Sequence, residues 1–150
     1  MISTYWNITL LCCFAACMLY VMRCDFKYKS LPVPALCCLL LLSFLHTPLC
    51  WQYSIGMTVC FAGFFVVLKF CAERILQKPA LGFGDVFLFA CVGLWVSPLY
   101  VPYYLIVLGL FGIFMAYLWR YLWDDIYFPF GFCIGLTLLV WIAGSTIMGA

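Results

Sequence analysis

Two of the five acidic residues in this 150-residue chain stand where a pair of carboxylates could do chemistry. Asp25 follows a long apolar run, and Asp85 follows two closely spaced glycines and opens another apolar run. Two carboxylates held close together cannot both ionise cheaply, so they share one proton. One can then hold a water as general base while its partner donates to a carbonyl. Such a pair titrates as a unit, so no separate pKa belongs to either acid. We predict that Asp25 and Asp85 together could activate a water molecule for attack on a substrate carbonyl.

The glycines Gly82 and Gly84 favour this interpretation of Asp85. Glycine lets the backbone bend and lets a second chain approach closely. A protease that cuts a helical substrate needs such an approach, because the substrate must be held extended while its amide is attacked. The sequence G-x-G-D is weak evidence alone, and it gains specificity from a second acid on a neighbouring link.

Each acidic residue also has a simpler interpretation. Asp85 could be the N-cap of the helix that it precedes. Asp25 lies among basic residues and could be a solvated member of that cluster. The other three acids lie near basic residues and are interpreted as ordinary polar residues of the links: Glu73, Asp124 and Asp125.

The composition places these residues in a membrane protein. Hydrophobic residues make up 69% of the chain and charged residues 8%, whereas soluble domains carry about 25% charged residues. Seven basic and five acidic side chains with their polar neighbours cannot cover the surface of a soluble domain of this size. A net charge of +2 without a basic stripe argues against nucleic-acid binding, and an aromatic content of 21% excludes disorder.

The eleven cysteines do not form a metal-binding or redox pattern. Most lie inside apolar runs, where cysteine acts as a small hydrophobic residue. The sequence contains no C-x-x-C, so neither a zinc ribbon nor a thioredoxin-like pair is proposed. We expect no metal, no cofactor and no structural disulfide.

Six apolar runs approach the roughly 20 residues that cross a bilayer. The first is followed rather than preceded by basic residues, which indicates a retained span and not a secretory signal peptide. The uncharged stretch 86–119 would be about 51 Å long as one helix, and Pro98 and Pro102 supply the break that it needs. The expected spans are 4–22, 31–46, 54–70, 86–100, 103–119 and 127–147.

The charges fix an orientation for this arrangement. With the N-terminus outside, the links after the first, third and fifth spans face the cytoplasm and hold all seven basic residues, as the positive-inside rule requires. All five acids share that side. We therefore expect an all-α integral membrane protein with six transmembrane helices and both termini extracytoplasmic. The connections are too short for a separate soluble domain, so residues 1–150 form a single membrane-embedded domain.

Three segments on the inner links resemble one family. The segment 24–32 has an Asp, a basic-polar stretch and then Leu31-Pro32. Residues 82–85 match a G-x-G-D motif, and Pro129-Phe130-Gly131 precedes the last span. In this order the three segments resemble the type IV prepilin peptidases, and the resemblance covers nearly the whole chain.

The resemblance implies an aspartic endopeptidase of the bacterial inner membrane. It would cut the basic leader peptide from type IV prepilins or type II secretion pseudopilins, on the cytoplasmic side, after a glycine and ahead of a hydrophobic helix. Asp25 and Asp85 match the two catalytic aspartates of the family. The residues expected to bind substrate or shape the motifs are Gly82, Gly84, Pro129, Phe130 and Gly131. The expected partners are these substrates and the lipid bilayer, without nucleic acid.

The chain departs from the family pattern at two points. Long members carry a cytoplasmic insertion with paired cysteines that is associated with N-methylation. Here the link after the first span is too short for it, which argues against methyltransferase activity. Phe87 stands where the family often has Lys, two residues after the aspartate.

Two other functions fit six spans. A non-catalytic membrane component, such as a small transporter or an assembly subunit, would place acids at mid-membrane along a substrate path. An intramembrane protease of the presenilin type shares G-x-G-D, but has more spans and deeper acids. None of the acids in this chain lies in the middle of an expected span.

Overall fold

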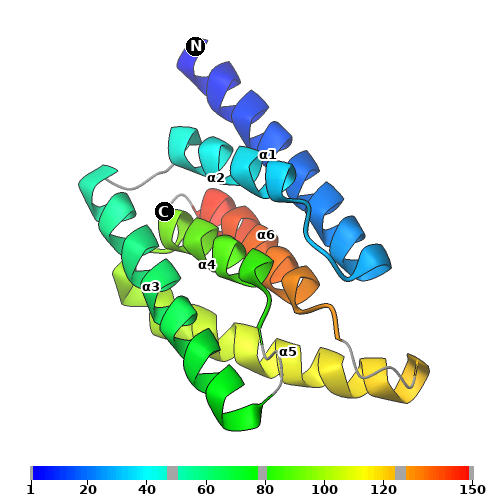
Figure 1. The fold of residues 1–150 in the computed structure, drawn as a ribbon. Helices are drawn as coiled ribbons and strands as arrows, with labels where there is room; N and C mark the ends of the chain where they lie inside the picture. Colours follow the sequence, from blue (N-terminus) through cyan, green and yellow to red (C-terminus); the bar gives the residue numbers. More distant parts are fainter. Residues whose placement is uncertain (1, 47–50, 78–80, 124–127, 149–150) are drawn as a thin grey trace.

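The structure is a computed structural model that describes residues 2–46, 51–77, 81–123 and 128–148. Within these ranges the chain forms six α-helices and one short 3-10 helix (Figure 1). Their bounds are α1 Ile2–Tyr28, α2 Val33–His46, α3 Trp51–Leu76, α4 Phe83–Trp95, η1 Pro98–Tyr100, α5 Val101–Trp123 and α6 Phe130–Met148. The six α-helices follow the six expected apolar runs in order, so the all-helical fold class is confirmed.

Within the described residues, three stretches are long and apolar enough to cross a membrane: Ile8–Tyr28, Gln52–Ile75 and Pro98–Leu122. The other three apolar helices are shorter. At 13 residues α4 is about 20 Å long, less than the roughly 30 Å of a hydrocarbon core. The structure therefore agrees with a membrane protein, and the crossing of the bilayer by all six helices stays a prediction.

Two helices continue past the apolar runs that define them. The expected span 4–22 lies within α1, which runs on through Asp25 to Tyr28. The helix ends where Lys29 takes a left-handed φ of 51° and donates its N–H to the Asp25 carbonyl at 2.9 Å. Charged side chains do not end a helix, whereas a left-handed residue does. Asp25 is thus part of a helix and not of the link after it.

The end of α3 follows the same rule. The expected span stopped at residue 70, but the helix runs to Leu76 and ends at Gln77, which has a φ of 54°. The Gln77 N–H donates to the Glu73 carbonyl at 2.9 Å. As a result Glu73, expected in a polar link, lies on the same helix as Lys69.

The break expected near Pro98 exists, but Pro98 opens the next helix instead of ending the previous one. The Val96 N–H donates to the Val92 carbonyl at 2.9 Å and closes α4. Residues Pro98–Tyr100 then form the 3-10 turn that leads directly into α5. Proline has a fixed φ and no N–H, which suits the first turn of a helix. The expected boundary at residue 100 is therefore wrong by about one turn.

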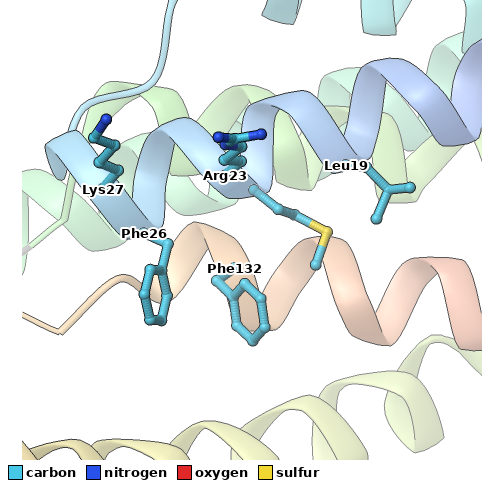
Figure 2. Close-up of a pocket in the computed structure, with 6 residues that line it drawn as sticks. Leu19, Arg23, Phe26, Lys27 and Phe132 are labelled. Atoms are coloured by element: carbon cyan, nitrogen blue, oxygen red, sulfur yellow. The ribbon is translucent and has the colours of Figure 1, made fainter.

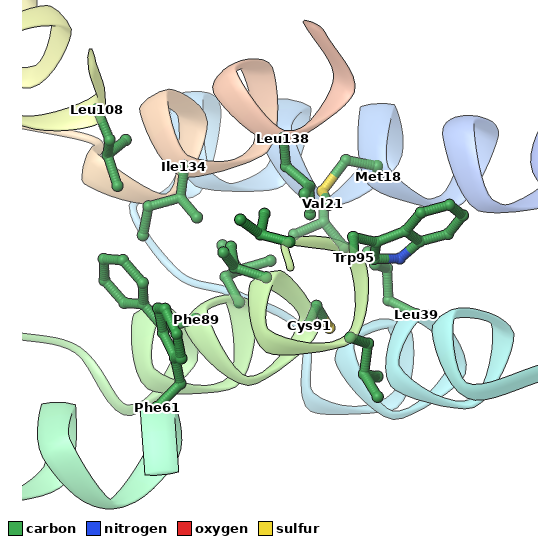
Figure 3. Packing of buried hydrophobic residues seen from close by; sticks show 14 of the residues in the cluster. Met18, Val21, Leu39, Phe61, Phe89, Cys91, Trp95, Leu108, Ile134 and Leu138 are labelled. Carbon is green, nitrogen blue, oxygen red and sulfur yellow. The ribbon is translucent and has the colours of Figure 1, made fainter. Parts of the chain in front are cut away.

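The core is built around α4. Its residues from Leu88 to Trp95 are all buried, and a helix that is apolar on every side belongs in a protein interior. It packs against α2, α3 and α6, while α1 packs on α2 and α6, and α5 packs on α6. Figure 1 shows α4 between these neighbours, and Figure 3 shows its Phe89, Cys91 and Trp95 facing side chains from several helices. The packing of the short helix α4 in the core thus fixes the position of its first residues relative to α1 and α6.

Candidate active site

Asp25 is buried in the last two turns of α1 and is bonded to the start of α6. The residue is 7% exposed, and its Oδ2 accepts the Phe132 N–H at 2.9 Å. The Gly131 N–H also donates to this carboxyl group. The first N–H groups of a helix have no partner inside it, so the carboxyl group satisfies two of them in α6. The interpretation of Asp25 as a solvated member of a basic cluster is therefore wrong.

Asp85 lies in the first turn of α4, three residues after the residue that caps it. The N-cap is Gly82, in an extended conformation with φ −71° and ψ 146°. The Gly82 N–H donates to Asp85 Oδ2 at 3.3 Å. Asp85 thus supplies the acidic half of a capping box, in which the third helical residue reaches back to the capping residue. The expectation that Asp85 is itself the N-cap is wrong, because the helix begins earlier, at Phe83.

Gly131 joins the two carboxyl groups. A Cβ atom added to Gly131 would lie 2.9 Å from Asp25 Oδ2 and 3.2 Å from Asp85 Oδ1. The two oxygens are therefore no farther apart than the sum of these distances, about 6 Å. One water molecule with two hydrogen bonds of about 2.8 Å each spans at most about 5.6 Å, which lies within this upper limit. The structure brings together the two acids that the sequence analysis paired.

The first and second motifs also contact each other directly, through Leu31 and Gly84. A Cβ atom added to Gly84 would lie 2.5 Å from Leu31 Cδ1, so the link between α1 and α2 packs tightly on the first turn of α4. Only glycine allows this approach, since real Cβ contacts are not that short. Leu31 from the first motif, Gly84 from the second and Gly131 from the third thus surround one site.

Pro129 and Phe130, the other two residues of the third motif, lie where α6 begins. Pro129 is buried directly before α6. The Phe130 ring turns toward the hydrophobic core, with its centroid 6.3 Å from that of Phe89, so it packs against α4. Glu73 pairs with Lys69 on its own helix. Asp124 and Asp125 lie outside the described residues.

One residue near the site was missed by the sequence analysis. Lys69 was counted only among the basic residues of the inner links, but it is buried on α3 and interacts electrostatically with Asp85. Its Nζ donates to the Leu81 carbonyl at 2.5 Å. The signal that could have found it is its spacing, since Lys69 and Glu73 stand four residues apart at the end of an apolar run, as ion-paired residues of one helix face do.

An open cavity of about 620 Å³ lies between α1 and α6 (Figure 2). Apolar side chains form most of its wall, and two basic side chains border it. Phe26 and Phe132 contribute rings whose centroids are 6.0 Å apart. The residues that line the cavity are Leu19, Met22, Arg23, Phe26, Lys27 and Phe132. Phe132 therefore belongs both to the carboxyl site and to the cavity, because its N–H binds Asp25 and its ring lines the cavity.

Fold and site define a class of protein: an all-helical membrane protein with two neighbouring carboxyl groups where three helix ends meet. Within the described part of the chain, no three His, Cys, Asp or Glu side chains gather as a metal site would need.

Comparison with known proteins identifies the family. The chain belongs to the type IV leader peptidase family, whose sequence model matches residues 12–117. This confirms the predicted resemblance. The matched range contains Asp25 and the G-x-G-D segment, whereas residues 129–131 lie beyond it.

A curated relative supports the same assignment. Over 92 residues the chain is 36% identical to the "Type 4 prepilin-like proteins leader peptide-processing enzyme" of Escherichia coli O78:H11 (strain H10407 / ETEC). The matched segment covers 61% of this chain and 33% of that protein. This chain thus corresponds to about a third of the relative's length. No solved structure matches the chain.

Proposed function

We propose that this chain is a leader peptidase of the bacterial inner membrane that cuts by water activation between Asp25 and Asp85. The observation that carries the proposal is the approach of both carboxyl groups to the same point beside Gly131. Membership of the leader peptidase family supports it independently. The family also favours a leader peptidase over a transporter, an assembly subunit or a presenilin-type protease.

The proposed reaction uses one proton shared by the pair. The ionised carboxylate takes a proton from a water molecule held between the two groups, and that water attacks the carbonyl carbon of the scissile amide. The protonated carboxyl group donates to the carbonyl oxygen as charge develops there. The C–N bond then breaks: the leaving nitrogen takes the proton held by the first carboxylate, and one hydroxyl group of the tetrahedral intermediate returns its proton to the second carboxylate. The pair again holds one proton. The Phe132 and Gly82 N–H groups hold the two carboxyl groups in place during these steps.

The proposed substrates are type IV prepilins or type II secretion pseudopilins, cut on the cytoplasmic side. The basic residues of the inner links support this orientation by the positive-inside rule. The relative named above processes leader peptides by its printed name.

The open cavity between α1 and α6 fits the apolar part of such a substrate. Its walls are mostly apolar, and its charged residues Arg23 and Lys27 carry the same sign as a basic leader. Like charges repel the leader from this cavity. We therefore assign the cavity to the hydrophobic segment that follows the cut.

Co-expression with a prepilin tests the proposal. Asp25→Ala and Asp85→Ala are expected to leave the leader attached, which a shift in the size of the prepilin on an immunoblot reports. Ser43→Ala is the matched control, because Ser43 is a buried polar residue of α2 whose Oγ donates to the Leu39 carbonyl at 2.8 Å. Normal processing by either aspartate variant would refute the assignment of the pair.

A further inference from the structure

Lys69 is a buried cation on α3 that contacts the residues leading into α4. It is 7% exposed, and a buried charge is costly unless it is paired and hydrogen-bonded. Its Nζ pairs with the Glu73 carboxylate one turn further along α3. The same atom donates to the Leu81 carbonyl at 2.5 Å and lies 4.7 Å from the centre of the Phe83 ring. The lysine therefore ties α3 to the residues that lead into α4.

The Leu81 carbonyl and the Gly82 N–H are two ends of one peptide group. A peptide group is planar, so fixing the direction of its carbonyl fixes the direction of its N–H on the opposite side. That N–H donates to Asp85 Oδ2 at 3.3 Å. Hydrogen bonds in a chain also polarise one another, and a cation on the carbonyl strengthens the N–H as a donor. Lys69 thus reaches Asp85 through a single rigid group.

We propose that Lys69 is a positioning residue for Asp85, holding the Leu81–Gly82 peptide so that its N–H aims at the Asp85 carboxyl group. The inference rests on the proposed function, because it gives Lys69 a role in orienting one member of the catalytic pair. It assigns no direct contact between Lys69 and the substrate.

The charges around Asp85 give the lysine a second effect. Asp25 of α1 repels a negative charge on Asp85, and Lys69 of α3 attracts it. Glu73 shares the lysine with the Leu81 carbonyl, while the neighbouring Leu31 and Gly131 carry no charge. Phe87, two residues after Asp85 in the sequence, is 40% exposed and carries no charge. Lys69 therefore favours the ionised forms of the pair against the repulsion between its members.

Kinetics of purified variants in lipid vesicles test this role. For Lys69→Met we expect kcat to fall about 10- to 100-fold with KM changed less than about twofold, because the substrate site is intact and the acid is misplaced. We also expect the bell-shaped pH profile to move to higher pH, because removal of the cation makes the pair hold its protons more tightly. Lys69→Arg is expected to restore both quantities.

Arg74→Met is the matched control, because it removes a basic side chain from the same helix at an exposed position. It should leave kcat and the pH profile unchanged. If Lys69→Met does not accumulate, Lys69→Gln replaces it, with the same shift expected because the cation is absent.

The outcomes separate this inference from the proposed function. An unchanged kcat and pH profile in Lys69→Met, alongside inactive Asp25 and Asp85 variants, overturns the role of Lys69 alone. A fall in activity at every pH without a shift, not restored by arginine, also overturns it, since that pattern reports only lost packing. Full activity of the aspartate variants overturns the proposed function itself.

Discussion

At position 131 the site has room for a hydrogen atom and for nothing larger. A Cβ atom there would stand 2.9 Å from an oxygen of Asp25, closer than such atoms approach in real structures. The need for glycine comes from the two carboxyl groups, since Gly131 itself sits in an ordinary helix. Gly131, which the family resemblance marks only as part of a motif, thus leaves the space that the two carboxyl groups occupy.

We predict that Gly131→Ala lowers peptidase activity at least about tenfold without loss of the folded protein. The added methyl group must displace a carboxyl group, whereas alanine is favoured over glycine within a helix by about 0.5–1 kcal/mol. Gly144→Ala is the control, because it lies on the same helix with nothing within 4 Å of its added Cβ. Wild-type cleavage by Gly131→Ala would mean that the carboxyl groups do not need their present positions.

The pairing of the two acids could be predicted from their types and motifs, but their partners could not. Asp25 binds the N–H of Phe132, which is 107 positions away in the sequence. Such a contact depends on how α1 packs on α6, and no local pattern encodes that packing. Lys69 was missed for a related reason, because a lysine after an apolar run is usually solvated.

Among the elements, α3 and α4 approach each other closely. A Cβ atom added to Gly93 would lie 3.0 Å from the backbone carbonyl of Met57, so the two helices nearly touch. Small residues allow such close approach between membrane helices. The order of the helices could be predicted from the apolar runs, whereas their ends could not, because the left-handed residues Lys29 and Gln77 end α1 and α3 beyond the apolar residues.

We predict that Gly93→Leu destabilises the protein by about 1–3 kcal/mol or more, since the larger side chain forces α3 away from α4. The midpoint of thermal unfolding in detergent measures this effect. Gly109→Leu on α5 adds the same side chain where nothing lies within 4 Å and should leave the midpoint nearly unchanged. Equal midpoints for the two variants would contradict the close packing.

A separate prediction concerns the cavity between α1 and α6. Phe132→Ala removes the ring from the cavity but keeps the N–H that binds Asp25. We expect KM to rise about tenfold, because burying a Phe side chain is worth about 1.5–3 kcal/mol, with kcat changed less than about twofold. Phe114→Ala on α5, where the ring is exposed, is the control. A fall in kcat with KM unchanged would argue against substrate binding in this cavity.

For the molecule as a whole, the number of helices that cross the bilayer decides which side each end faces. Six crossings return the C-terminal end to the side of the N-terminal end, whereas crossing by the three long helices alone leaves the two ends on opposite sides. The distribution of basic residues favours six crossings, although α2, α4 and α6 are short. Short helices fit a membrane by thinning it locally, at a modest cost.

We predict that a reporter enzyme active only outside the cytoplasm is active when fused after Ala150. The same reporter fused after Gln77, at the end of α3, should be inactive, because the basic residues there mark the cytoplasmic side. Normalising to the amount of fusion protein in the membrane is the control. An inactive reporter after Ala150 would favour three crossings and place the two ends of the chain on opposite sides.

The central claim is that Asp25 and Asp85 act as one catalytic unit, and its most direct test is single-turnover cleavage of a prepilin by purified variants in lipid vesicles. We predict that Asp25→Asn and Asp85→Asn each lower the rate by about 10³-fold or more, since both carboxyl groups are needed to pass the proton. The double variant should be no slower than either single variant, because residues that act as a unit are not additive. Cleavage within about tenfold of the wild-type rate by either single variant, or a double variant slowed by the product of the two single effects, would contradict the account.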